Sequence, residues 1–355
     1  MLFMCNRLMD KYARLMPRLD IINIEFLKGI SQLFGIFFHF VFESFGQQNT
    51  NPGGKGLNDA LVQLKTAISR IRGDCGQWVK SRSPFSSSIS TPLNMPLSHT
   101  DSRLNGIANS NLKHVTSTSF GLKERCTGAD TISLVARLLQ KSKGHLHSIL
   151  LQNNAAIVDD FYVHLVGSVP DLVEQIHRTT ARLLLHISGY ADRIANAKWE
   201  VKELGMEHNG YVDLLLGEFK HYKMRLAQGG IRQEVQDTLI EYGLEHLSDT
   251  IVEGLSRVKR CTNEGRALMS LDFQVLITGL QHFLTINVKP KLLRVETFIK
   301  AFYLPETDYV HWARIHPEYT KNQIMGLINL VATMKGWKRK TKLEVLEKIE
   351  SASTL

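Results

Sequence analysis

The sequence predicts an all-α protein, an elongated helical bundle or rod with one long disordered linker inside the chain. Three observations support this prediction. Apolar residues recur at alternating spacings of four and three over much of the chain, as they do on one face of a helix. Two segments near the C-terminus begin with capping-box signatures. Few stretches alternate between apolar and polar residues as strands do, and Thr285–Val288 is the best short exception.

Length and composition fit an ordinary globular protein. The chain has 355 residues, 43% of them hydrophobic and 22% charged, with a net charge of +9, which excludes a fibrous or wholly disordered chain. Four cysteines without a CxxC pair exclude a disulfide scaffold and indicate reduced thiols in an intracellular protein. Nucleic-acid binding is not predicted, because no basic patch is interleaved with aromatic residues.

Residues 1–80 are expected to form an N-terminal helical segment. Its most apolar run, Leu33–Phe42, is shorter than the roughly 20 residues that a membrane span needs. We expect this run to lie in a helix that packs on protein, with Phe37, Phe38 and Phe42 in the contact; a bilayer span is the alternative. A second helix is predicted by the spacing of Leu57, Leu61, Leu64, Ile68 and Ile71.

Residues 81–127 differ in composition from the rest of the chain. Ser, Thr, Asn, Pro and Gly make up 25 of these 47 positions, and Phe85 and Phe120 are the only aromatic residues. So few large apolar side chains cannot form a core. Loops this long without secondary structure are usually linkers or disordered segments. The composition therefore predicts a disordered linker.

Residues 128–355 return to a helical pattern and are expected to form one domain. A helix is predicted to begin at Ser168, a suitable N-cap, with Pro170 in its first turn. The heptad seam that follows predicts one long helix of a bundle or coiled-coil-like rod. The seam residues are Val169, Val173, Ile176, Thr180, Leu183, Ile187, Tyr190, Ile194, Ala197, Val201 and Leu204.

Three further helices are predicted toward the C-terminus. The first follows Gly229-Gly230 and carries apolar residues at helical spacing. The other two are predicted by Thr320 with Gln323 and by Thr341 with Glu344, which match the capping box. The apolar positions of the first helix are Ile240, Leu244, Leu247, Ile251, Leu255 and Val258.

No pattern in the sequence predicts a catalytic, cofactor or metal site, and no small-molecule substrate is expected. Asn51–Gly56 is rich in glycine but does not match the phosphate-binding loop G-x-x-x-x-G-K-[ST]. No cluster of cysteines and histidines has zinc-ligand spacing. Cys261 lies beside Arg260, which could lower its pKa, but no histidine partner is identified. A buried structural cysteine is the simpler interpretation.

A basic run near the C-terminus is the candidate contact site. It contains no acidic residue and includes one tryptophan. A solvated turn between two helices is the simplest interpretation. The functional alternatives are contact with an acidic partner or with an anionic membrane surface, and a nuclear-localisation signal competes with both. The run consists of Lys335, Trp337, Lys338, Arg339, Lys340 and Lys342.

Two long stretches resemble the C-terminal domain of syndetin. They are Asn263–Gln274 and Val295–Glu306, and the second is followed by His311-Trp312 and His316–Gln323. The resemblance covers about residues 128–349. Syndetin is the distinctive subunit of the endosome-associated recycling protein (EARP) complex, a vesicle-tethering complex related to the Golgi-associated retrograde complex.

The resemblance implies a non-catalytic helical subunit of the multisubunit-tether type, without cofactors. Such a subunit acts in endocytic recycling and in retrograde transport from endosome to Golgi, with other tether subunits and SNARE proteins as partners. It would be cytoplasmic and peripheral on recycling endosomes or the trans-Golgi network. Family members are longer, so the chain is expected to be a C-terminal fragment, a short isoform or a truncated gene model. The alternatives are a helical adaptor, for example nuclear, and a helical enzyme that uses Cys261.

Overall fold

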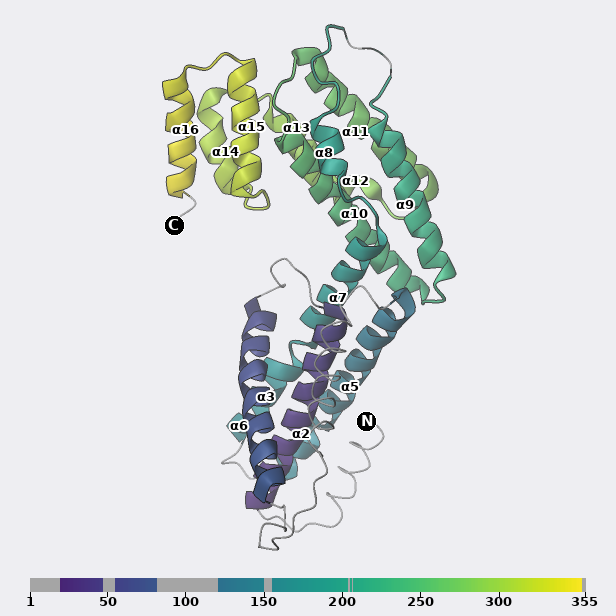
Figure 1. The fold of residues 1–355 in the computed structure, drawn as a ribbon, viewed down its shortest axis with the longest axis vertical. Coiled ribbons are helices and arrows are strands. Elements are labelled where there is room, and N and C mark those ends of the chain that lie inside the picture. The colour runs from purple at the N-terminus through teal and green to yellow at the C-terminus, as the bar shows by residue number, and fades with distance from the viewer. Residues whose placement is uncertain are drawn as a thin grey trace, which may run out of the picture. The chain divides into compact units, whose positions relative to one another are not determined.

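The computed structural model describes residues 20–46, 55–81, 121–149, 155–203, 205 and 207–352. Within these ranges all regular secondary structure is helical and none is a strand, which confirms the predicted all-α class there. The chain divides into two compact units, residues 1–180 and 181–355, and each is described by itself (Figure 1).

The first unit consists of long helices with shorter helical segments between them (Figure 1). The last helix, α7, begins in this unit and ends in the second. The elements are α2 (Asp20–Val41), the π-helix η1 (Phe42–Gly46), α3 (Lys55–Ser81), α5 (Leu122–Ile149), α6 (Ala155–Asp160), the π-helix η3 (Phe161–Val166) and α7 (Val169–Leu184).

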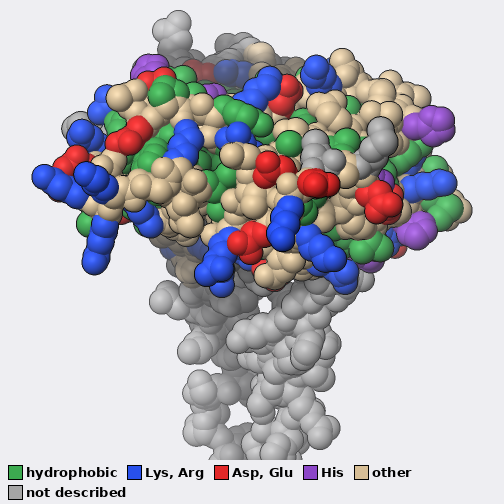
Figure 2. Space-filling model, turned by 90° about the horizontal axis from the view of Figure 1, so that it is seen from above, with side chains coloured by type: hydrophobic (Ala, Val, Ile, Leu, Met, Phe, Trp, Pro, Cys, Tyr) green, Lys and Arg blue, Asp and Glu red, His purple; other side chains and the backbone are tan. Residues whose placement is uncertain are grey.

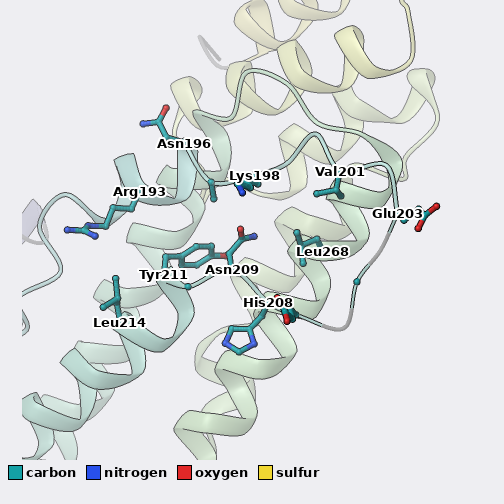
Figure 3. A pocket seen from close by; sticks show the side chains of 14 residues that line it. Arg193, Asn196, Lys198, Val201, Glu203, His208, Asn209, Tyr211, Leu214 and Leu268 are labelled. Carbon is teal, nitrogen blue, oxygen red and sulfur yellow. The ribbon is translucent and has the colours of Figure 1, made fainter.

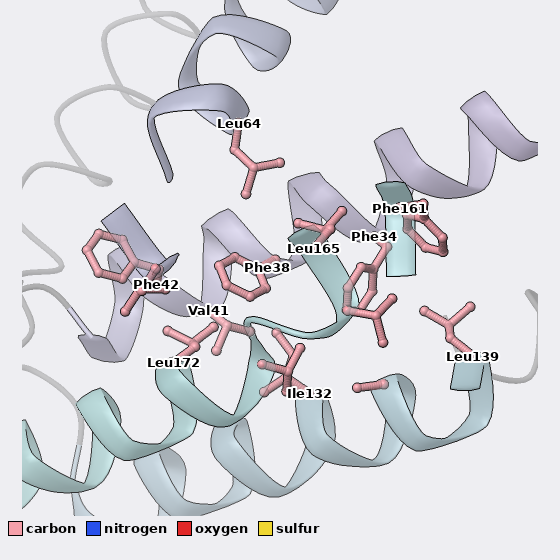
Figure 4. Packing of buried hydrophobic residues seen from close by; sticks show 14 of the residues in the cluster. Phe34, Phe38, Val41, Phe42, Leu64, Ile132, Leu139, Phe161, Leu165 and Leu172 are labelled. Atoms are coloured by element: carbon pink, nitrogen blue, oxygen red, sulfur yellow. The ribbon is translucent and has the colours of Figure 1, made fainter. Parts of the chain in front are cut away.

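Phenylalanines of α2 and η1 form much of the core of the first unit (Figure 4). The rings of Phe34 and Phe161 meet edge to face with centroids 6.1 Å apart. Phe38 and Phe42 are buried and Phe37 is partly buried against the same core, which confirms their predicted packing on protein. Each fully buried phenylalanine contributes about 1.5–3 kcal/mol through the hydrophobic effect.

Two buried polar side chains donate hydrogen bonds to carbonyl groups at the C-terminal end of the α2–η1 segment. The guanidinium of Arg125 donates to the Phe45 carbonyl at 2.9 Å, and the Gln175 amide donates to the Gly46 carbonyl at 3.3 Å. Burial lowers the pKa of Arg125 to about 10, so the side chain remains protonated at neutral pH. These bonds satisfy carbonyl groups that a helix end leaves without partners.

The predicted linker lies largely outside the described residues. α3 ends at Ser81, close to the expected start of the linker. α5 begins at Leu122, so residues 122–127 belong to a helix rather than to the linker. These six residues show no apolar periodicity of their own. They are helical because they pack against the rest of the first unit, where Arg125 and Cys126 are buried.

The second unit is arranged around α10, against which α8, α9, α12, α13 and α15 pack. All six apolar positions predicted for this helix are buried. The elements are α8 (Tyr190–Ala195), α9 (Tyr211–Gln228), α10 (Gln233–Ser256), α11 (Asn263–Phe283), α12 (Val288–Lys291), α13 (Leu293–Ala301), the 3₁₀-helix η4 (Glu306–Asp308), α14 (Tyr309–Ile315), α15 (Lys321–Met334) and α16 (Arg339–Ala352).

The prediction of one long helix along the heptad seam is wrong. α7 ends at Leu184, and Gly189 has φ +81°, a left-handed conformation that glycine adopts most readily. The short α8 then ends near Ala195, where the Trp199 indole donates to the Ile194 carbonyl at 2.7 Å. Several seam residues are nevertheless buried, so the spacing predicted burial but not helix continuity. They are Val169, Ile176, Thr180, Ile187, Tyr190 and Ile194.

Close backbone contact and a polar network attach α15 to α10. A Cβ atom at Gly326 would lie 2.0 Å from the Ser256 carbonyl oxygen, so the two helices approach as closely as glycine allows. Beside this contact, the Gln323 amide donates to Glu253 at 3.1 Å and its carbonyl accepts from Arg294 at 3.1 Å. Arg294 also pairs with Asp249 of α10. The network therefore links α10, α13 and α15.

Candidate functional site

The basic run begins in the turn between α15 and α16 and continues into the first residues of α16. Gly336 has φ +63°, and the Trp337 N–H donates to the Ala332 carbonyl at 2.9 Å. This bond spans six residues and has the pattern of a Schellman motif, which ends a helix at a left-handed residue. The turn thus follows from Gly336, and it places the basic residues at the surface.

The six residues of the run differ in their surroundings. Lys335 donates to the Leu304 carbonyl at 2.6 Å, and the half-buried Trp337 packs edge to face against Tyr309, centroids 5.7 Å apart. These two side chains therefore hold the turn to the rest of the unit. The others extend from the start of α16 and, within the described residues, are used in no short ion pair. They are Lys338, Arg339 and Lys340, which are exposed, and Lys342, which is half-buried.

The two predicted capping boxes have different outcomes. Thr320 accepts from the Gln323 N–H at 3.3 Å and the Gln323 side chain accepts from the Thr320 N–H at 3.0 Å, so this box is confirmed. Thr341 does not cap a helix, because α16 already begins at Arg339. The first turn of α16 therefore contains Arg339 and Lys340, whose charges oppose the positive N-terminal end of the helix dipole.

Ion pairing does little to compensate these charges. Lys340 and Glu344 are 3.9 Å apart with side chains 89% and 54% exposed, a geometry in which surface pairs contribute little to stability. In the face of the molecule seen in Figure 2, Lys and Arg are interspersed with acidic and apolar side chains. The exposed cations of the turn therefore contribute little to the stability of the fold, and they are accessible to an anionic surface.

A cavity of about 630 Å³ lies between α9, α11 and the loop after α8 (Figure 3). Its lining combines basic and acidic side chains with the apolar Leu268 of α11 and Leu214 of α9. The ionisable lining residues are Arg193, Lys198, Glu203, Glu207 and His208. This mixture of charges favours no single ligand.

The buried Asp272 holds two residues that line this cavity, Asn209 and Tyr211, in place. Its carboxylate accepts from the backbone N–H and the side-chain amide of Asn209, both at 2.9 Å, and from the Tyr211 hydroxyl. Burial raises the pKa of Asp272, while the donors oppose that shift. Burial and the nearby carboxylate raise the pKa of Tyr211 well above its usual value. Because its carboxylate oxygens accept these hydrogen bonds, Asp272 anchors the loop to α11 and has a structural role.

No role is predicted for Asp272 from the sequence, although its place on the apolar face of a helix is a sign of a buried hydrogen-bond network. It occupies a buried position among Leu268, Met269, Phe273 and Leu276 of α11. A single acid on the apolar face of a helix is expected to have buried donors. Which residues supply those donors depends on the tertiary fold, because Asn209 lies 63 residues away in the sequence.

The surroundings of Cys261 do not activate its thiol. Burial raises its pKa to about 11, and the positive charge of Arg266 only partly opposes this shift. The thiol donates to the Thr262 carbonyl at 3.2 Å, and Cys261 does not line the cavity described above. A nucleophilic cysteine requires the opposite shift. Within the described ranges, no three His, Cys, Asp or Glu side chains gather as metal ligands.

Part of α2 remains apolar and exposed. Leu33, Ile36 and Phe40 are 40%, 43% and 55% exposed. Among the described residues, Ile24–Gly46 is the one helical stretch that is long and apolar enough to cross a membrane. Core helices of soluble proteins can meet the same criterion, and the opposite face of α2 packs in the core of the first unit.

Comparison with known proteins identifies the family. The family described as "Syndetin, C-terminal" matches residues 119–350. The chain belongs to the syndetin C-terminal family. Its relatives include proteins named syndetin from Gallus gallus and Mus musculus, each 30% identical over 91% of this chain. The match covers 34% of each relative, so the chain spans about a third of their length. No solved structure matches the chain.

Proposed function

We propose that the chain is a non-catalytic subunit of a vesicle-tethering complex and acts through protein–protein contacts. The process would be endocytic recycling and endosome-to-Golgi transport, with the chain peripheral on recycling endosomes or the trans-Golgi network. The observation that supports this proposal is the match to syndetins over 91% of the chain. The helical fold and the raised pKa of Cys261 also favour an interaction protein over an enzyme.

Other tether subunits and SNARE proteins are the proposed partners, and the basic turn is the proposed contact. Lys338, Arg339 and Lys340 are exposed at the start of α16, where they oppose the helix dipole. An acidic protein surface would neutralise them, and charge complementarity of this kind speeds association and selects partners. Contact with anionic lipid is the alternative, at about 1 kcal/mol per basic residue.

Affinity purification with mass spectrometry tests the proposal. The tagged chain and a tagged full-length syndetin would be purified from the same cells, and tether subunits and SNAREs quantified in both. Recovery of shared tether subunits is expected. Their absence from the chain's sample, with full recovery by full-length syndetin, would contradict the proposal for this chain.

Fluorescence microscopy of the tagged chain separates the proposal from the adaptor alternative. Localisation to recycling endosomes or the trans-Golgi network is expected. An exclusively nuclear signal would favour the nuclear adaptor, because a Lys- and Arg-rich segment can also act as a nuclear-localisation signal.

A further inference from the structure

We propose that a groove between α14, α15 and α16 binds a short acidic segment of a partner protein through one apolar side chain and neighbouring carboxylates. This inference rests on the proposed role as an interaction subunit and names a contact and a class of partner for it. The groove has a volume of about 530 Å³, within the range of sites that hold small ligands or a few side chains.

The floor of the groove is apolar. Val310 and Ala313 of α14 are half-buried, whereas Ile324 of α15 and Ile349 of α16 are only 6% and 3% exposed. Burying an apolar side chain against such a floor contributes about 25 cal/mol per Å² removed from water. The floor therefore suits one apolar side chain of an incoming segment.

Two basic residues line the same groove. Arg314 is exposed and, within the described residues, forms no ion pair or hydrogen bond. Lys321 pairs with Glu350 at 2.8 Å, but both side chains are about half exposed, so the pair contributes little to stability. A carboxylate of a partner can take the place of Glu350 at small cost. An apolar floor beside two cations is complementary to a partner segment in which an apolar residue has acidic neighbours.

The charge at the groove itself favours the same occupant. Arg314 carries the lining charge that has no ion partner among the described residues, because Lys321 pairs with Glu350. A carboxylate beside Arg314 is attracted, whereas a second copy of the same surface would bring two Arg314 side chains together, which is unfavourable. The groove is also concave and its isoleucines are recessed, so a peptide side chain can reach the floor whereas a flat bilayer surface cannot.

Peptide selection on the purified full-length chain tests the proposal. A phage-displayed library of random peptides would be selected on the immobilised protein, and the enriched peptides measured by fluorescence anisotropy. Peptides with an apolar residue flanked by Asp or Glu are expected. Ala313→Trp, which fills the groove, should abolish their binding, and Arg314→Glu should weaken it about tenfold and reduce its salt dependence.

Lys220→Glu is the matched control, because it makes the same charge change at an exposed position of α9 outside the groove. It should change the affinity no more than about twofold. Equal losses in Arg314→Glu and Lys220→Glu would overturn the groove and indicate a general charge effect. Three other results would also overturn the proposed groove. The first is that no acidic peptides are enriched. The others are that the chain self-associates and Ala313→Trp abolishes this, or that it binds phosphatidylserine vesicles and Arg314→Glu alone abolishes this.

The selection uses purified protein and no trafficking component. Its failure would therefore overturn the groove while leaving the proposed tethering function to its own purification experiment. Conversely, peptide binding at the groove without recovery of tether subunits would retain the groove and contradict the function.

Discussion

Replacing Gly326 by Ala is expected to weaken the attachment of α15 to α10. The added methyl carbon would lie 2.0 Å from the Ser256 carbonyl oxygen and 2.9 Å from its carbonyl carbon. Non-bonded atoms at their optimal separation are about 3.5 Å apart. Both contacts are with backbone, so no change of rotamer can relieve them and the two helices must move apart.

The expected loss of stability follows from two opposing effects. Overpacking costs about 1–3 kcal/mol, and occasionally more. The cost of Gly326→Ala lies at the upper end of this range, because the added methyl group meets the backbone of Ser256 and not a flexible side chain. The higher helix propensity of alanine offsets up to about 1 kcal/mol of this cost. The net effect is therefore destabilisation by about 2 kcal/mol or more. Separation of the helices would also lengthen the 3.1 Å hydrogen bond between Gln323 and Glu253.

Native-state hydrogen exchange measures this effect locally. Amides of α15 should exchange about 30-fold faster in Gly326→Ala, as a local loss of 2 kcal/mol requires, with amides of α5 as the internal reference. Gly217→Ala in α9 is the matched control, because a Cβ there meets nothing within 4 Å, and it should leave exchange unchanged or slower. Exchange of α15 within about threefold of the parent in Gly326→Ala would refute the reasoning.

Three further predictions concern single side chains. Gln323→Ala should lower the unfolding free energy by about 1–3 kcal/mol in urea denaturation, because it removes the side-chain hydrogen bonds of Gln323 to Arg294, to Glu253 and to the Thr320 N–H; an unchanged midpoint would contradict this role. Burial, with the charge of Arg182, lowers the pKa of His246 from 6.5 to about 4. The stability this contributes is present above pH 6.5 and lost as the pH falls toward 4, so His246→Gln should reduce the acid loss, and an identical pH profile would exclude it. Cys261 should react with iodoacetamide at neutral pH more slowly in the folded than in the urea-unfolded protein, as followed by peptide mass spectrometry, because its pKa is raised to about 11; equal rates would show an accessible, ordinary thiol.

The features predictable from sequence are those that depend on neighbours along the chain. The Thr320–Gln323 capping box and the helix after Gly230 follow from short-range spacing, and both are observed. A turn between the last two helices is also predictable, although α16 begins at Arg339 and not at Thr341. The break at Gly189 shows the limit of such reasoning, because the 4-3 spacing continues through a non-helical turn whose apolar residues are also buried.

The features that could not be predicted depend on contacts between distant segments. Trp337 lies among the exposed cations in the sequence, yet it packs on Tyr309, and Lys335 donates to the Leu304 carbonyl 31 residues away. The groove near Arg314 likewise exists only where three helices meet. No local spacing encodes these pairings, since each depends on how the helices pack.

The most direct test of the proposed function measures how much tether subunit the chain recovers when the basic turn is reversed. The triple variant Lys338→Glu, Arg339→Glu and Lys340→Glu would be purified from cells beside the parent at low and high salt. Its control makes the same charge change at three other exposed lysines, Lys220, Lys259 and Lys289. The proposal predicts that the parent and the control recover tether subunits in a salt-sensitive way and the turn variant recovers few. Equal recovery by all three proteins, or no recovery by the parent, would contradict it.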